Sequence, residues 1–233
     1  MTTLNQAAYN ILNQLRGGRS TNNEYLSLEQ IKYWIKYYRA LLIRRDEERY
    51  SRVEGLSQTI VVPFTSNVTY ATDGQTLPTP GANVPANVAE SDDAIPTLVR
   101  LKQMPAILGV TIEDSLSQVP YIDYRRSMWN QYDRYTSASR RCWLRENKLY
   151  VSGWDLTGVV TPTVHLTGIF EDPEAAYNFE APATPWDDNV NEFPLTADLL
   201  QQVTQSIIGG EGQIMLQTPS DHTLDNLPDQ QAE

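Results

Sequence analysis

Two helix-start signals within the first thirty residues place a pair of amphipathic helices at the beginning of the chain. Residues 3–6 (TLNQ) and 27–30 (SLEQ) each set a hydroxyl side chain three positions before a glutamine, which is the capping-box pattern. Gly17 and Gly18 end the first predicted helix, and the second extends to about Glu48. Apolar residues follow each box at helical spacing: Leu4, Ala8, Ile11 and Leu15 in the first helix, and Leu28, Ile31, Ile35, Tyr38 and Leu42 in the second.

The middle of the chain is predicted to be rich in strands. Residues 57–64 (SQTIVVPF) form a β-branched run that ends near a proline, which favours a strand at the edge of a sheet. A hairpin that turns at residues 146–148 is expected within residues 142–151. Further strands are expected at 97–103, 106–113 and 163–170, a third helix within 121–139, and a last helix that is capped by Thr196 and contains Leu199, Leu200, Val203 and Ile207. This order predicts an α+β fold with N-terminal helices, a β-rich middle, a C-terminal helix and an extended acidic tail.

Length and composition favour one domain with an appended tail. The 233 residues are enough to bury most of their apolar surface, and Cys142, the only cysteine, cannot form an internal disulfide. Residues 65–96 hold four prolines among Thr, Asn, Gly and Ala, so we interpret them as a long loop. We expect a single α+β domain over residues 1–216, followed by a tail at 217–233 that is flexible or becomes ordered against a partner.

Charge is distributed unevenly along the chain. The net charge is -11, yet residues 149–233 contain 14 Asp and Glu and no Lys or Arg, which leaves +3 for residues 1–148. Such polarity suits contact between subunits, because a basic face on one copy can meet an acidic face on the next. An acidic tail that only aids solubility is the alternative interpretation.

The sequence offers little support for catalysis. Adjacent carboxylates occur, but neighbours in sequence point apart, so no pair that shares a proton is implied. His165 is expected on the polar face of its strand, and Cys142 in a buried position. His165, His222 and Cys142 form no cluster at metal-ligand spacing. We therefore expect no enzyme activity, no cofactor and no metal site.

No apolar run approaches the length of a membrane span, so we expect no membrane partner. The first ten residues lack the basic start and apolar core of a secretory signal. The chain is accordingly expected to be made and used in a cytoplasm.

Basic and aromatic side chains are interleaved in the first 52 residues. Because Tyr and Arg are enriched at protein interfaces, we interpret this stripe as a subunit contact. The same residue types can contact phosphates and stack on bases, so a nucleic-acid-binding module is an alternative, which the nearby carboxylates and the acidic net charge disfavour. The predicted interface residues are Arg16, Arg19, Lys32, Trp34, Lys36, Arg39, Arg44, Arg45 and Arg49.

Four short segments resemble a known structural protein of viruses. The stretches at 4–12 (LNQAAYNIL), 16–22 (RGGRSTN), 27–31 (SLEQI) and 44–46 (RRD) are similar to the start of a neck ring protein of crAss-like tailed bacteriophages. The similarity is looser at residues 145–150 and 168–173. In that family the protein is the head-to-tail connector below the portal.

The resemblance implies a virion protein without catalytic residues, made in the host bacterial cytoplasm. It implies a homo-oligomer, a dodecameric ring like the portal, that contacts the portal protein and adjacent ring or tail proteins. Genomic DNA would pass through the channel of this ring on its way out of the capsid. Another virion role, such as a tail-tube or minor capsid protein, is the alternative. We expect the basic helices to face the portal and the neighbouring subunit, and the acidic C-terminal region to meet a neighbouring subunit, the next ring or the channel through Asp187, Asp188, Glu192 and Glu211.

Overall fold

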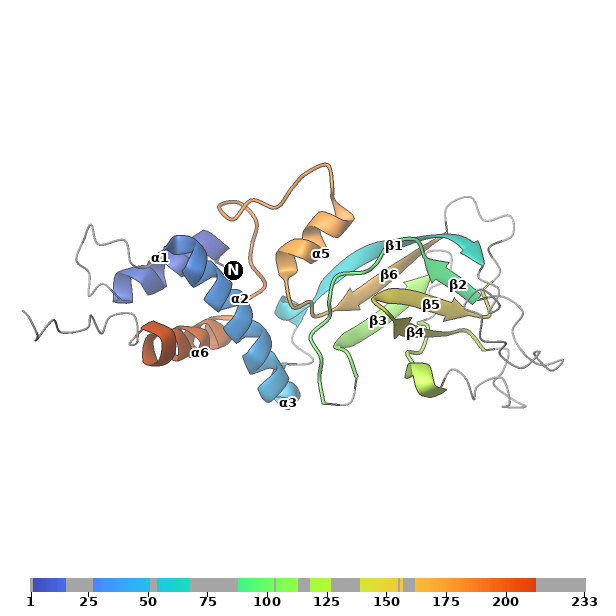
Figure 1. Ribbon diagram of the computed structural model, residues 1–233, viewed down its shortest axis with the longest axis horizontal. Coiled ribbons are helices and arrows are strands. Elements are labelled where there is room, and N and C mark those ends of the chain that lie inside the picture. Colours follow the sequence, from blue (N-terminus) through green and yellow to red (C-terminus); the bar gives the residue numbers. More distant parts are fainter. Residues whose placement is uncertain are drawn as a thin grey trace, which may run out of the picture.

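The protein combines a helical part and a β-sheet part, which lie at opposite ends of an elongated molecule (Figure 1). This arrangement in the computed structural model confirms the predicted α+β class. The structure describes residues 2–15, 27–50, 54–67, 88–102, 104–112, 118–126, 139–154, 156 and 162–212. The predicted acidic tail at 217–233 lies outside these residues, and the domain boundary at residue 216 stays a prediction.

Both predicted N-terminal helices are present, with the caps that the sequence indicates. The Thr3 hydroxyl accepts a hydrogen bond from the Gln6 backbone N–H, and the Gln6 side chain accepts one from the Thr3 N–H, both at 3.3 Å. The Ser27 hydroxyl accepts from the Gln30 N–H at 3.2 Å. The helices are α1 (Leu4–Leu15), α2 (Leu28–Arg45), α3 (Glu47–Tyr50), α5 (Pro173–Glu180) and α6 (Ala197–Ile207), with a 3-10 turn η1 (Glu54–Leu56) and a π-helical turn η2 (Ile208–Gly212).

A first hydrophobic core holds the helical part together. Helix α2 packs against both α1 and α6. The predicted N-cap Thr196 is confirmed, because its hydroxyl accepts from the Leu199 N–H. Buried apolar residues from the three helices meet in one cluster, including Leu4, Ile11, Ile31, Ile35, Leu199 and Val203.

The second part is an antiparallel six-stranded sheet with the order β3-β6-β1-β2-β5-β4. The segment 118–122 joins its two outermost strands: the Val119 N–H donates to the Val110 carbonyl in β3, and the Ile122 N–H donates to the Cys142 carbonyl in β4. The sheet thus curls into a barrel around a second hydrophobic cluster. The strands are β1 (Gln58–Asn67), β2 (Val88–Ser91), β3 (Ile107–Ile112), β4 (Arg141–Arg145), β5 (Lys148–Ser152) and β6 (Thr163–Gly168).

The prediction that the first strand lies at an edge is wrong, because β1 pairs with β6 on one side and with β2 on the other. Pro63 is tolerated at this interior position because it is the last residue paired with β6, while pairing with β2 begins at Phe64. The missing N–H of the proline therefore falls where β1 changes partners, and neither ladder is interrupted.

Two further strand predictions need correction. Residues 65–96 are not a loop throughout, since they include the end of β1 and all of β2. Residues 97–103 form no strand in their described part and make only isolated bridges there, at Leu98 and Arg100. The chain folds back on itself here, because the Leu101 N–H donates to the Met104 carbonyl and the Ala106 N–H to the Val99 carbonyl.

The predicted hairpin is confirmed as β4 and β5. Glu146 and Asn147 connect these strands and have φ values of 52° and 61°, as a tight hairpin turn requires. The predicted strands at 106–113 and 163–170 are confirmed as β3 and β6. Of the third predicted helix, residues 124–126 are helical and 127–138 lie outside the described residues.

Candidate interaction surface

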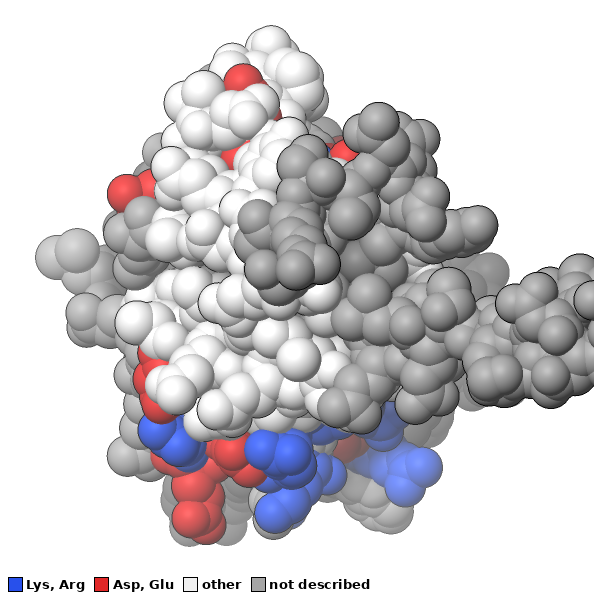
Figure 2. Space-filling view, turned by 90° about the vertical axis from the view of Figure 1, so that its left-hand side faces the viewer, with Lys and Arg blue, Asp and Glu red and all other residues white. Residues whose placement is uncertain are grey.

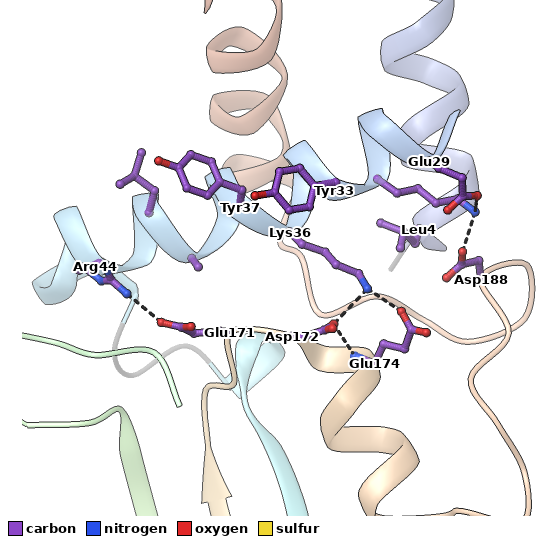
Figure 3. A pocket seen from close by; sticks show the side chains of 13 residues that line it. Leu4, Glu29, Tyr33, Lys36, Tyr37, Arg44, Glu171, Asp172, Glu174 and Asp188 are labelled. Carbon is purple, nitrogen blue, oxygen red and sulfur yellow. Dashed lines mark hydrogen bonds and ion pairs between the residues drawn. The ribbon is translucent and has the colours of Figure 1, made fainter. Parts of the chain in front are cut away.

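An open groove of about 680 Å³ runs along helix α2 (Figure 3). One wall is the exposed side of α2, and the other comes from the segment between β6 and α5 together with the loop that carries Asp188. Its lining contains five acidic and three basic side chains: Glu29, Glu171, Asp172, Glu174 and Asp188, with Lys32, Lys36 and Arg44.

The two lysines of α2 reach across the groove to carboxylates far along the chain. Lys32 Nζ lies 2.7 Å from Asp188 Oδ2 and 2.9 Å from Glu29 Oε1. Lys36 Nζ lies 2.5 Å from Glu174 Oε2 and 3.1 Å from Asp172 Oδ1 (Figure 3). These contacts hold α5 and the 186–188 loop against α2, so the groove is a fixed feature of the subunit.

Electrostatics agree with this geometry. Partial burial favours the neutral form of Lys32, but hydrogen bonds to Asp188 and Glu29 outweigh it and raise the lysine pKa. Burial likewise favours the neutral form of Asp188, and hydrogen bonds from Lys32 and Trp186 reverse this and lower the aspartate pKa. The ionised pair is therefore the stable form at neutral pH.

Arg44 completes the row of cations on α2, with its Nη2 atom 2.8 Å from Glu171 Oε1. Lys32, Lys36 and Arg44 are thus neutralised by residues 171–188 of the same chain. The charge asymmetry seen in the sequence is partly an internal contact: the basic N-terminal helix holds the acidic segment that follows the barrel.

Beside this charged row, α2 presents an exposed apolar ridge. Tyr33, Tyr37 and Leu41 follow one another at four-residue spacing and are 65%, 52% and 40% exposed. The two tyrosine rings are stacked, with centroids 6.5 Å apart and planes inclined by 14°. Three large side chains exposed on one side of a helix make this ridge a candidate interaction surface, because contiguous exposed apolar patches are typical of protein–protein contacts.

Two predicted interface residues lie inside the subunit instead. Trp34 is 7% exposed and belongs to the helical core. Arg39 is fully buried, and its guanidinium donates to the carbonyl oxygens of Pro194, Phe170 and Leu56. Neither side chain is on the surface of the subunit; the pattern of interleaved basic and aromatic residues did not reveal that its members face different ways.

The remaining predicted site residues are spread over the molecule. Arg45 is exposed and contacts its neighbour Asp46, while Arg49 Nη2 lies 2.6 Å from Asp198 Oδ2. Of the predicted acidic residues, Asp188 lines the groove and Asp187 and Glu192 are close to it in sequence. Arg16 and Arg19 lie outside the described residues, and Glu211 belongs to η2.

The barrel carries a second charged surface that sequence reasoning missed. Residues 121–126 run beside β4. Tyr121 forms a parallel bridge with Cys142, and the Arg145 guanidinium lies 5.2 Å from the centre of the Tyr124 ring. Within the part of the chain that the structure describes, Arg125, Arg126, Arg140 and Arg141 have no carboxylate in ion-pair distance. We define the arginine surface as Arg125, Arg126, Arg140, Arg141 and Arg145, together with the acidic Asp123 and Glu146.

The helical end of the molecule is largely uncharged. Figure 2 shows this end, where most Lys, Arg, Asp and Glu residues gather along the lower rim, a few Asp or Glu residues lie nearer the top, and most of the described surface is white. The sequence explains it, because α1 contains no charged residue and α6 contains only Asp198. A surface of this kind can approach another protein without electrostatic repulsion.

Other kinds of site find no support among the described residues. They contain no group of three or more His, Cys, Asp or Glu side chains that is arranged to hold a metal ion. Cys142 is buried in the barrel, as expected, and burial raises the pKa of its thiol to about 12. No helix in the described ranges is long and apolar enough to cross a membrane.

Comparison with known proteins supplies one family. The family model CrAss ring 2, described as phage tail ring protein 2, matches residues 6–230. A search of curated proteins found no match.

Proposed function

The chain belongs to the crAss-like phage tail ring protein 2 family, and from this premise we propose that it forms a dodecameric ring in the neck of the virion, between portal and tail. The family match over residues 6–230 is the observation that carries the proposal, because it covers the helical part, the barrel and most of the C-terminal region. As a phage tail ring protein, the chain is a structural component of the virion.

The surfaces of the subunit support assembly into a closed ring. A cyclic oligomer with a head-to-tail interface needs two different, complementary patches on every subunit. The groove along α2 and the arginine surface on the barrel are two such patches, and they lie on separate parts of the fold. A subunit that carried only one self-complementary patch would form dimers instead.

We place the portal and the neighbouring tail ring at the two rims of this ring. The largely uncharged helical end suits contact with another protein ring, because it brings few charges into the interface (Figure 2). Four of the 14 carboxylates of residues 149–233 line the groove, and we assign those outside it to a channel for DNA, since an acidic wall repels phosphates and prevents adhesion during ejection. In this role the protein is synthesised in the host cytoplasm and performs no catalysis.

Immunogold labelling of intact virions tests the neck position. Antibodies against the exposed surfaces should place gold at the junction of head and tail in electron micrographs, and a portal antibody provides the positional control. Label distributed along the whole tail or over the capsid would contradict the proposed position and would favour a tail-tube or minor capsid role.

A further inference from the structure

We propose that the groove along α2 of one subunit receives the arginine surface of the next subunit, so that these two patches form the repeating contact of the ring. This inference rests on the proposed ring function and adds which surfaces meet. The occupant of the groove is a second copy of this chain.

Charge complementarity is the first argument for this occupant. The groove is lined by five acidic and three basic side chains, so its formal charge is -2. The arginine surface combines five arginines with Asp123 and Glu146, so its formal charge is +3. The lysines of the groove are already held by two carboxylates each, whereas four of the arginines have no ion pair among the described residues. Opposite charges on the two patches favour this orientation and disfavour groove-to-groove contact.

Chemical complementarity is the second argument. The Tyr33 and Tyr37 rings stand exposed at the groove, and arginine is the cation that packs best on aromatic faces because its guanidinium is planar and weakly hydrated. The barrel already shows this contact within one subunit, where Arg145 lies over the Tyr124 ring. Tyr and Arg are also the residue types that most often dominate the binding energy of an interface.

The placement of the two patches on the fold is the third argument. The groove belongs to α2 and the residues around α5, and the arginine surface belongs to β4 and residues 121–126 on the barrel. Because the patches are different and lie on different parts of the subunit, the contact is head-to-tail. Repetition of such a contact gives a ring when the rotation between neighbouring subunits closes after one full turn.

Cysteine cross-linking of the full-length protein tests the contact directly. The double variant Tyr33→Cys/Arg126→Cys should form a ladder of covalent oligomers with a short bismaleimide, ending at the mass of the complete ring. A mixture of the two single variants, each with a different tag, should give only heterodimers. Cys142 adds no background because it is buried. The matched control is Met104→Cys/Arg126→Cys, since Met104 is also an exposed apolar residue but lies outside the groove.

Native mass spectrometry of the same samples gives their oligomeric state, which tests the ring function separately from the proposed contact. Rings that form without a cross-link between positions 33 and 126 would overturn the proposed contact and leave the ring function standing. The same conclusion would follow if the only cross-links joined position 33 of one subunit to position 33 of another. A protein that forms neither rings nor cross-links would overturn both the proposed contact and the ring function.

Charge reversal provides a second readout. Arg125→Glu/Arg126→Glu should remain folded and should lose ring formation, and Tyr33→Ala should weaken ring formation by at least about tenfold. If the reversed variant instead keeps its ring and loses affinity for duplex DNA, the arginine surface is a nucleic-acid contact and the proposal is wrong.

Discussion

Arg39 donates a hydrogen bond from Nη1 to the carbonyl oxygen of Phe170 at 2.8 Å, and this contact joins the middle of α2 to the segment just after β6 across 131 positions of sequence. Its other nitrogens donate to Pro194 and Leu56, and its guanidinium lies 5.8 Å from the centre of the Phe193 ring. Burial lowers the Arg39 pKa to about 10, which still leaves the side chain charged at neutral pH. One buried cation therefore fixes how the helical part meets the barrel.

Replacement of Arg39 by Met should destabilise the subunit strongly. The substitution keeps most of the apolar stem but leaves three buried carbonyl oxygens without a donor, each at a cost of about 1 kcal/mol or more. We expect the free energy of unfolding, measured with urea, to fall by roughly 3 kcal/mol. Arg45→Met is the control, because Arg45 is exposed on the same helix, and it should change stability by less than about 0.5 kcal/mol. Equal stability of the two variants would show that Arg39 is not the connecting residue.

Asp188→Asn should remove the ion pair with Lys32 while an amide oxygen remains available to accept from the Trp186 indole. We expect a loss of about 1 kcal/mol at neutral pH, because both partners are largely shielded from solvent. The folded pKa of Asp188 lies below its unfolded value, so the contribution is present above the unfolded pKa and disappears as pH falls through the folded pKa.

Urea unfolding of the wild type and Asp188→Asn at several pH values checks this sign. The stability difference should be constant from about pH 6 to about pH 9, since the Lys32 pKa is raised, and it should shrink as the pH is lowered toward about 3. A difference that grows in acid would contradict the assignment.

Gly168→Ala should damage the barrel even though it adds a single carbon. A Cβ at this position would lie 2.8 Å from the Ala106 carbonyl oxygen and 2.6 Å from a methyl group of Leu98. Because the backbone oxygen cannot move cheaply, we expect a loss of about 2 kcal/mol in thermal or urea unfolding. Gly209→Ala is the matched control, since a Cβ there meets no atom within 4 Å, and it should be neutral or slightly stabilising. Similar behaviour of both variants would contradict the close approach at Gly168.

Ring formation should weaken as salt concentration rises. If the groove and the arginine surface form the contact, an increase from about 0.05 M to about 0.5 M NaCl shortens the Debye length severalfold and screens their attraction. Sedimentation velocity should show a shift from ring to smaller species over this range. A ring that becomes more stable with salt would point to an interface dominated by apolar contact.

Local signals in the sequence were sufficient for most elements of the fold. The caps at Thr3, Ser27 and Thr196 depend on residues three positions away, and the hairpin turn depends only on Glu146 and Asn147, so all four were predicted correctly. Helix α5 was not predicted, although the sequence carries a local signal for it. Asp172 is the N-cap, where it accepts a hydrogen bond from the Glu174 N–H, and Pro173 occupies the first turn.

Features that depend on distant partners could not be predicted in this way. Strand β2 contains only four residues and is defined by its pairing with β1 and β5. The burial of Arg39 depends on carbonyl groups up to 155 residues away, and the groove depends on Lys36 meeting Glu174, 138 residues later. The sequence therefore indicated which residue types would form an interface, but the fold decided which of them remain on the surface.

Native mass spectrometry of the purified full-length protein, alone and mixed with its portal, tests the central claim most directly. We expect a single closed oligomer, with the mass of twelve subunits, or a complex of defined stoichiometry that forms when portal is added. A protein that remains a monomer under both conditions would contradict the ring.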